Sequence, residues 1–176
     1  MVSAKQLVLK PQDFVVALKL AVNAQREFRL IDLSRELRMA LSAVHGSIER
    51  CERARLISRS AGSIRAVRFA VKEFAIHGVK YAFPGVLGTH SRGIPTAIAG
   101  PTLRRHFDDA DSLAPVWPDP AGSAFGPSLS PLHPSVPAAC ELDDRLFDVM
   151  TLLDALRVGA ARERELALVR LEELLG

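Results

Sequence analysis

Seven of the eleven prolines in the chain lie between residues 112 and 139. Proline lacks a backbone N–H donor and fixes φ, so this density excludes a continuous helix and makes regular structure unexpected there. The stretch also carries apolar side chains that a flexible linker would not need. These are Trp117, Phe125, Leu129 and Leu132. We therefore expect a proline-rich strap that lies against a folded surface and buries these four side chains.

The composition of the whole chain is that of a globular protein in a reducing compartment. Of its 176 residues 48% are hydrophobic, and two cysteines are too few to hold a chain of this length as a disulfide framework. No run of eighteen apolar residues occurs, so we predict no membrane-spanning helix. These features predict a cytoplasmic protein.

Charge is segregated along the chain, although the net charge is only +3. Eleven basic and five acidic side chains lie between Arg26 and Lys72, which gives this block a charge of +6. From Cys140 onward, nine acidic side chains accompany five basic ones. A basic block before an acidic tail is typical of a nucleic-acid-binding surface joined to a region with another role, and solvated charge without any partner is the alternative.

The first part of the chain predicts three short helices. Pro11 suits the first position of a helix within Lys10 to Phe28. Between Leu30 and Ile57, apolar residues recur at helical spacing and mark two more helices. Their inner stripes consist of Leu33 and Leu37, and then of Val44, Ile48 and Cys51.

This spacing is that of a helix-turn-helix, whose second helix presents its outer face to the major groove of DNA. Ser42 is the expected N-cap of that recognition helix, and small or hydrogen-bonding residues follow on its outer side. Arginines beside it would contact phosphates and set the register. The candidate DNA-binding residues are Arg35, Ser42, Ala43, His45, Gly46, Ser47, Arg50, Arg53 and Arg92. A three-helix core that merely packs is the alternative interpretation.

A winged variant of the motif also needs a β-hairpin, for which there are two candidate segments. The first runs from Ser58 to Arg68 and turns at Gly62, and the second runs from Tyr81 to Ala99 with Arg92 near its tip. We favour the second, because a helical stripe after Ser63 leaves little room for the first. Arginine at such a tip can enter the minor groove.

The tail predicts two helices separated at Gly159. In the first, five apolar residues are spaced four, three, four and three apart, which gives an a/d seam of about two heptads. They are Leu142, Leu146, Val149, Leu153 and Leu156. We predict that this seam binds a partner helix, from a second copy or from another protein, or else packs on its own domain.

The segment from Arg29 to Ile57 resembles the winged helix-turn-helix family of bacterial regulators, with Arg55 where that family usually has glycine. Further stretches are similar to a group of such regulators, the AbiEi-type antitoxins encoded beside nucleotidyltransferase toxins. They are IHGVKYAFPG from Ile76, SRGIPTAIAGP from Ser91, VWPDPAG from Val116 and DALRVGAARERELA from Asp154. The resemblance implies an amino-terminal part that represses its own operon and a carboxy-terminal part that contacts a protein partner.

The sequence lacks the common motifs of catalysis and of metal or phosphate binding. The five histidines share no metal-ligand spacing with the two cysteines, and no CxxC, HExxH or GxSxG occurs. Gly85, Gly88 and Gly93 are not followed by the Lys-Ser/Thr pair of a phosphate-binding loop. We therefore predict a protein that is not an enzyme and uses no cofactor or metal.

These patterns predict a mostly α fold with a small β-hairpin wing. A winged helix-turn-helix is expected over residues 1–103, a Pro-rich strap over 104–139 and a C-terminal helical pair over 140–176. The favoured function is sequence-specific binding of double-stranded DNA by a homodimeric transcriptional repressor, refined by the resemblance to the antitoxin of a nucleotidyltransferase toxin. The alternative is an interaction module whose winged helix and acidic tail bind an enzyme partner without DNA recognition.

Overall fold

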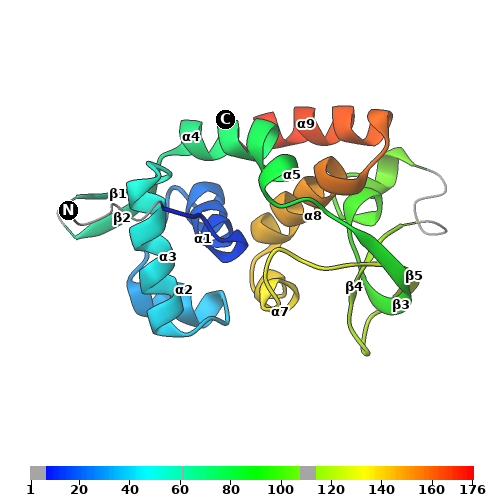
Figure 1. Ribbon diagram of the computed structural model, residues 1–176, viewed down its shortest axis with the longest axis horizontal. Helices are drawn as coiled ribbons and strands as arrows, with labels where there is room; N and C mark the ends of the chain where they lie inside the picture. The colour runs from blue at the N-terminus through cyan, green and yellow to red at the C-terminus, as the bar shows by residue number, and fades with distance from the viewer. Residues whose placement is uncertain (1–6, 61, 108–113) are drawn as a thin grey trace, which may run out of the picture.

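The computed structural model describes residues 7–60, 62–107 and 114–176. Helices and a hairpin from the first part of the chain occupy one end of an elongated molecule, and a small sheet occupies the other (Figure 1). The architecture is therefore a mixture of helices and strands, with one sheet more than the predicted wing. Among the described helices, none combines the length and the apolar character needed to cross a membrane.

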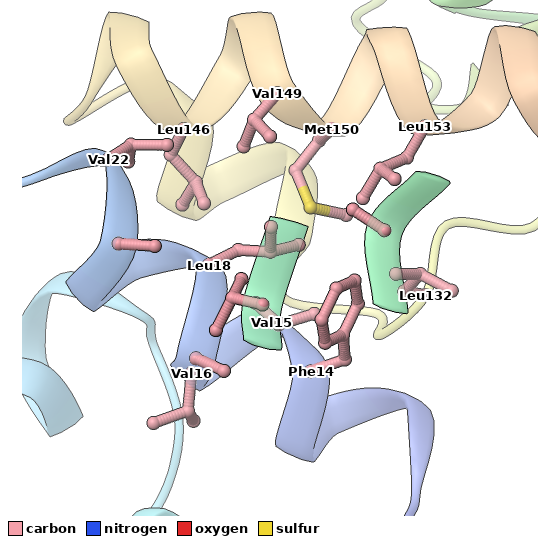
Figure 2. Packing of buried hydrophobic residues seen from close by; sticks show 14 of the residues in the cluster. Phe14, Val15, Val16, Leu18, Val22, Leu132, Leu146, Val149, Met150 and Leu153 are labelled. Carbon is pink, nitrogen blue, oxygen red and sulfur yellow. The ribbon is translucent and has the colours of Figure 1, made fainter. Parts of the chain in front are cut away.

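Helix α1 (Pro11–Val22) lies inside the molecule, because it is apolar on almost every side. Every residue from Asp13 to Val22 is buried, and a helix that is apolar all round belongs to the interior. Pro11 opens the helix, as predicted. One side of α1 packs on helix α8 (Asp144–Val158), where Figure 2 shows Leu18 and Val22 beside Leu146.

Helix α3 (Leu41–Arg53) packs on α1 and on helix α2 (Leu30–Glu36), and both α2 and α3 have the predicted inner stripes. The residues of both stripes are buried: Leu33, Leu37, Val44, Ile48 and Cys51. The predicted N-cap is wrong, because the cap position of α3 is Ala40. Ser42 lies in the first turn of the helix and is exposed.

A hairpin of strands β1 (Ile57–Ser60) and β2 (Ser63–Ala66) follows α3 directly. Gly62 adopts a φ of +83° at its turn, a conformation that glycine adopts without a Cβ clash. The first candidate segment is thus the hairpin, and the preference for Tyr81 to Ala99 is wrong. The helical stripe begins later than expected, since helix α4 (Arg68–Glu73) starts only after β2 has ended.

The second candidate segment divides between a helix and a sheet. Helix α4 continues through a π-helical turn, η1 (Phe74–Gly78), into α5 (Val79–Ala82), so the first residues of the candidate hairpin are helical. Strand β3 (Leu87–Pro95) follows, and the expected return strand is instead a 3₁₀ turn, η2 (Ala97–Ala99). A second 3₁₀ turn, η3 (Arg104–His106), lies at the start of the range 104–139.

The proline-rich strap contains regular structure that was not expected from its composition. Strands β4 (Val116–Pro118) and β5 (Ala124–Leu129) both pair antiparallel with β3, and they meet each other in parallel at Val116 and Ser128. A short helix, α7 (Val136–Cys140), follows. Trp117, Leu129 and Leu132 are buried as predicted, whereas Phe125 is 68% exposed, so that part of the prediction is wrong.

The two tail helices are α8 and α9 (Ala161–Leu175), which pack on each other. Four of the five seam residues are at most 4% exposed and belong to the same core as α1: Leu146, Val149, Leu153 and Leu156. Only Leu142, which precedes the helix, is exposed. The seam therefore packs on its own chain, because α1 supplies its apolar partner surface, and its prediction as a partner-binding site is wrong.

Candidate nucleic-acid interface

Helix α3 keeps one stripe of side chains open to solvent. Ser42, His45, Glu49 and Arg53 are exposed, and their spacing of three or four residues places them along one side of the helix. Ala43 and Gly46 are half-buried beside this stripe. The opposite side packs on α1 and α2. The part of the proline-rich strap that the structure describes does not bury this stripe, and His45 faces outward as predicted.

Arg50 is bound within the protein instead of facing outward. Its Nε and Nη2 atoms each donate to an Asp13 carboxylate oxygen at 2.7 Å, and Asp13 is completely buried. The hydrogen bonds that Arg50 donates to Asp13 raise the pKa of Arg50. A Cβ at Gly46 would lie 3.2 Å from Nη1 of Arg50, so the glycine leaves room for this guanidinium. The prediction of Arg50 as a base-reading residue is therefore corrected.

The prediction of Ser47 as a DNA-binding residue is also wrong, because its exposed fraction is 0%. Its Oγ lies 3.4 Å from Gln12 Nε2 and from Arg50 Nη2, between α1 and α3. The signal was available in the sequence: position 47 is three residues after Val44 and four before Cys51, which is the spacing of the inner stripe. Cys51 is also buried on the inner stripe, and this burial raises the pKa of its thiol to about 12.

Two arginines at the ends of α3 hold a left-handed backbone. Arg38, in the turn before α3, has a φ of +53°, and Arg55, just after it, has a φ of +61°. Both side chains are exposed. For a residue with a Cβ this conformation costs about 1–2 kcal/mol. Arg38 is one of the arginines beside the recognition helix that were expected to contact phosphates. Arg55 was not a predicted site residue, although the resemblance gave a signal for it, since the similar family has glycine there.

Several other cations of the basic block are neutralised within the chain. In the hairpin Arg59 pairs with Glu52 of α3, and Arg65 Nη2 lies 2.9 Å from Glu27 Oε1. Arg35 on α2 and Arg53 at the end of α3 are exposed, as predicted. Arg35 and Arg53 form no ion pair with any residue that the structure describes, and the same is true of Arg38 and Arg55.

Arg92 does not belong to this surface. It lies on β3, at the opposite end of the long axis from α3 (Figure 1). Its Nη1 donates to the carbonyl oxygen of Gly122 at 3.1 Å, which ties β3 to the loop between β4 and β5. The prediction failed because it depended on a Tyr81 to Ala99 hairpin that does not form.

No protein-family model, curated protein or solved structure matches the chain. The resemblance to winged-helix regulators therefore rests on the sequence motifs quoted above. Across residues 7–60, 62–107 and 114–176, no group of three or more histidine, cysteine, aspartate or glutamate side chains is placed to hold a metal ion. The chemistry that this surface offers is hydrogen bonding and positive charge around an exposed helix.

Proposed function

We propose that the protein binds double-stranded DNA with α3 in the major groove and the β1–β2 hairpin beside it, and that it acts as a transcriptional repressor. The order of three helices followed by a hairpin supports a winged helix-turn-helix interpretation. The small side chain of Ser42 lies exposed at the amino-terminal end of α3, the part of such a helix that contacts base edges.

The observation that carries the proposal is the pair of left-handed arginines that flank α3. Arg38 and Arg55 each adopt a backbone conformation that glycine adopts at no steric cost. Unusual backbone conformations of this kind gather at functional sites, where they place a side chain. A phosphate contact by each guanidinium accounts for the presence of arginine at both ends of the helix that would enter the groove.

The charges of the surface set the expected strength of phosphate binding. Four exposed arginines are available without breaking an ion pair within the described residues: Arg35, Arg38, Arg53 and Arg55. The exposed pairs of Arg59 and Arg65 stabilise the chain by only about 0–1 kcal/mol each, so DNA can compete for these side chains too. With four phosphate contacts, the logarithm of the association constant should fall with the logarithm of salt concentration with a slope of about −3 to −4.

Replacing Arg55 with glycine tests the proposal, because stability and DNA binding should change in opposite directions. Arg55→Gly removes the backbone strain, so the free energy of unfolding should rise by about 1 kcal/mol. The same change removes a phosphate contact, so duplex affinity should fall and the salt slope should shrink by about one. Urea unfolding and fluorescence anisotropy, with duplexes from upstream of the protein's own gene, measure the two effects.

Arg164→Ala on α9 is the matched control, since it removes an exposed arginine from another helix. It should leave duplex affinity unchanged. If neither the wild type nor the control binds any duplex, even at low salt, the proposal fails and the interaction-module alternative is favoured. If Arg55→Gly binds as tightly as the wild type, the role assigned to the flanking arginines is wrong.

The homodimer and the toxin partner stay predictions, and both now need a surface other than the α8 seam. Four of its five residues are buried within the chain. Light scattering of the protein alone and with duplex DNA measures the stoichiometry directly. A dimer on a palindromic duplex would place two α3 helices about one turn of DNA apart.

A further inference from the structure

The exposed stripe of α3 contains a carboxylate, Glu49, that forms no ion pair with any lysine or arginine that the structure describes. Of the two acidic residues of α3, Glu52 is hydrogen-bonded to Arg59 of the hairpin. Glu49 accepts no hydrogen bond from any side chain that the structure describes, and its Oε2 lies 4.0 Å from Nδ1 of His45. The Glu49 side chain is 48% exposed.

A free carboxylate is an unfavourable residue for general contact with DNA. It is repelled by phosphates, and in the major groove it is repelled by the O6 and N7 of guanine and the O4 of thymine, which are all acceptors. The amino groups of cytosine N4 and adenine N6 are donors, but adenine places its N7 acceptor beside the donor, and glutamate is one of the side chains that pair with cytosine N4. A carboxylate in the groove is thus tolerated only where it meets such a donor.

We propose that Glu49 determines sequence specificity by accepting a hydrogen bond from the N4 amino group of a cytosine. This inference rests on the proposed DNA binding. Glu49 stands one helical turn after His45 and two after Ser42, in the middle of the exposed stripe. Phosphate contacts by Arg38 and Arg55 at the two ends of α3 would fix the register that turns this stripe toward the bases.

The proposal gives Glu49 two measurable effects. Pairing with cytosine favours the specific site, and repulsion from phosphates and from acceptor edges disfavours every other sequence. Glu49→Gln keeps the size of the side chain, removes its charge and adds a donor. This variant should bind random-sequence duplexes more tightly than the wild type and should discriminate less at the cytosine position.

The experiment selects duplexes from a random pool with the wild-type protein and with Glu49→Gln. The wild-type site should contain a fixed C·G pair, and changing that pair to T·A should weaken wild-type binding about tenfold. The same change should alter Glu49→Gln binding less than about threefold. Glu165→Gln on α9 removes an equal charge from an exposed position outside α3 and should behave as the wild type.

Failure of the inference and failure of DNA binding give different results. If the wild type enriches a site and Glu49→Gln enriches the same site with the same discrimination, Glu49 does not read a base and only this inference is overturned. If no duplex is enriched or bound at low salt, the DNA-binding function and the inference both fail. Circular dichroism of each variant verifies that the exposed substitution leaves the fold intact.

Discussion

At the residue scale, the contact between Arg50 and Asp13 joins the first helix to the third. The carboxylate is completely buried, and the guanidinium meets it with two parallel hydrogen bonds of 2.7 Å. Helical spacing shows that position 50 lies beside the inner stripe, but it gives no sign of a partner 37 residues earlier in the chain. The inner stripe of α3 could be predicted from local pattern, whereas the role of Arg50 depended on tertiary structure.

We predict that Arg50→Ala destabilises the fold by about 3–5 kcal/mol, because it leaves a buried carboxylate without its charged partner. Urea unfolding monitored by circular dichroism measures this loss. Arg53→Ala, which truncates an exposed arginine of the same helix, should change stability by no more than about 0.5 kcal/mol. Equal stabilities of the two variants would show that the Arg50–Asp13 pair does not hold the helices together.

At the scale of elements, the sequence predicted helices well and missed sheet pairing and packing partners. Pro11 and the apolar spacing indicated α1 to α3, since helix periodicity is local. Strands β4 and β5 escaped prediction because their partner, β3, lies more than twenty residues earlier and prolines obscured them. The a/d seam of α8 was visible in the sequence, but such spacing is the same whether its partner is another chain or, as here, α1.

A buried ionic cluster holds the start of α8 against α1 and α2. Lys19 is 1% exposed, and its Nζ lies 2.6 Å from Asp143 Oδ2 and 2.8 Å from Glu36 Oε2. Burial alone would raise the pKa of Asp143, but hydrogen bonds from Lys19 and Asn23 outweigh it and lower the pKa. The pKa of Glu36 is lowered in the same way, by Arg26 and Lys19 against burial.

A lowered carboxyl pKa stabilises the fold only above the pKa of the unfolded chain, which is about 4 for these groups. We therefore predict that the stabilisation by these two carboxylates is constant from neutral pH to about pH 5 and is progressively lost as the pH falls below about 4. Urea unfolding across this range tests the prediction. Asp143→Asn should be less stable at neutral pH and should lose less on acidification; an unchanged acid profile in this variant would contradict the assignment.

At the scale of the whole molecule, one buried core crosses all three predicted sequence ranges. It includes Leu18 of α1, Trp117 of β4 and Leu153 of α8. Trp117 is completely buried, and its Nε1 donates to Asp154 of α8 at 2.6 Å. The predicted ranges 1–103, 104–139 and 140–176 follow changes in composition along the chain. In the fold they are joined by the packing of α8 and by the pairing of β3 with β4 and β5.

This shared core predicts a single cooperative unfolding transition. Trp117 is the only tryptophan, so its fluorescence reports the sheet end, whereas far-UV circular dichroism is dominated by helices throughout the chain. The two signals should give the same urea midpoint and the same slope. Two separated midpoints would mean that the sheet end and the three-helix end unfold independently.

Helix α1 forms a buried ionic contact toward each end of the molecule. Asp13, in the first turn of α1, binds Arg50 of α3, and Lys19, six residues later, binds Asp143 at the beginning of α8. Asp13 and Lys19 are both buried, and about 9 Å of continuous helix separates them. Asp13 and Lys19 belong to the same uninterrupted helix, so no loop lies between the two contacts. A continuous series of polar contacts therefore runs from α3 through α1 to α8, and from α8 to the sheet through the hydrogen bond that Trp117 donates to Asp154.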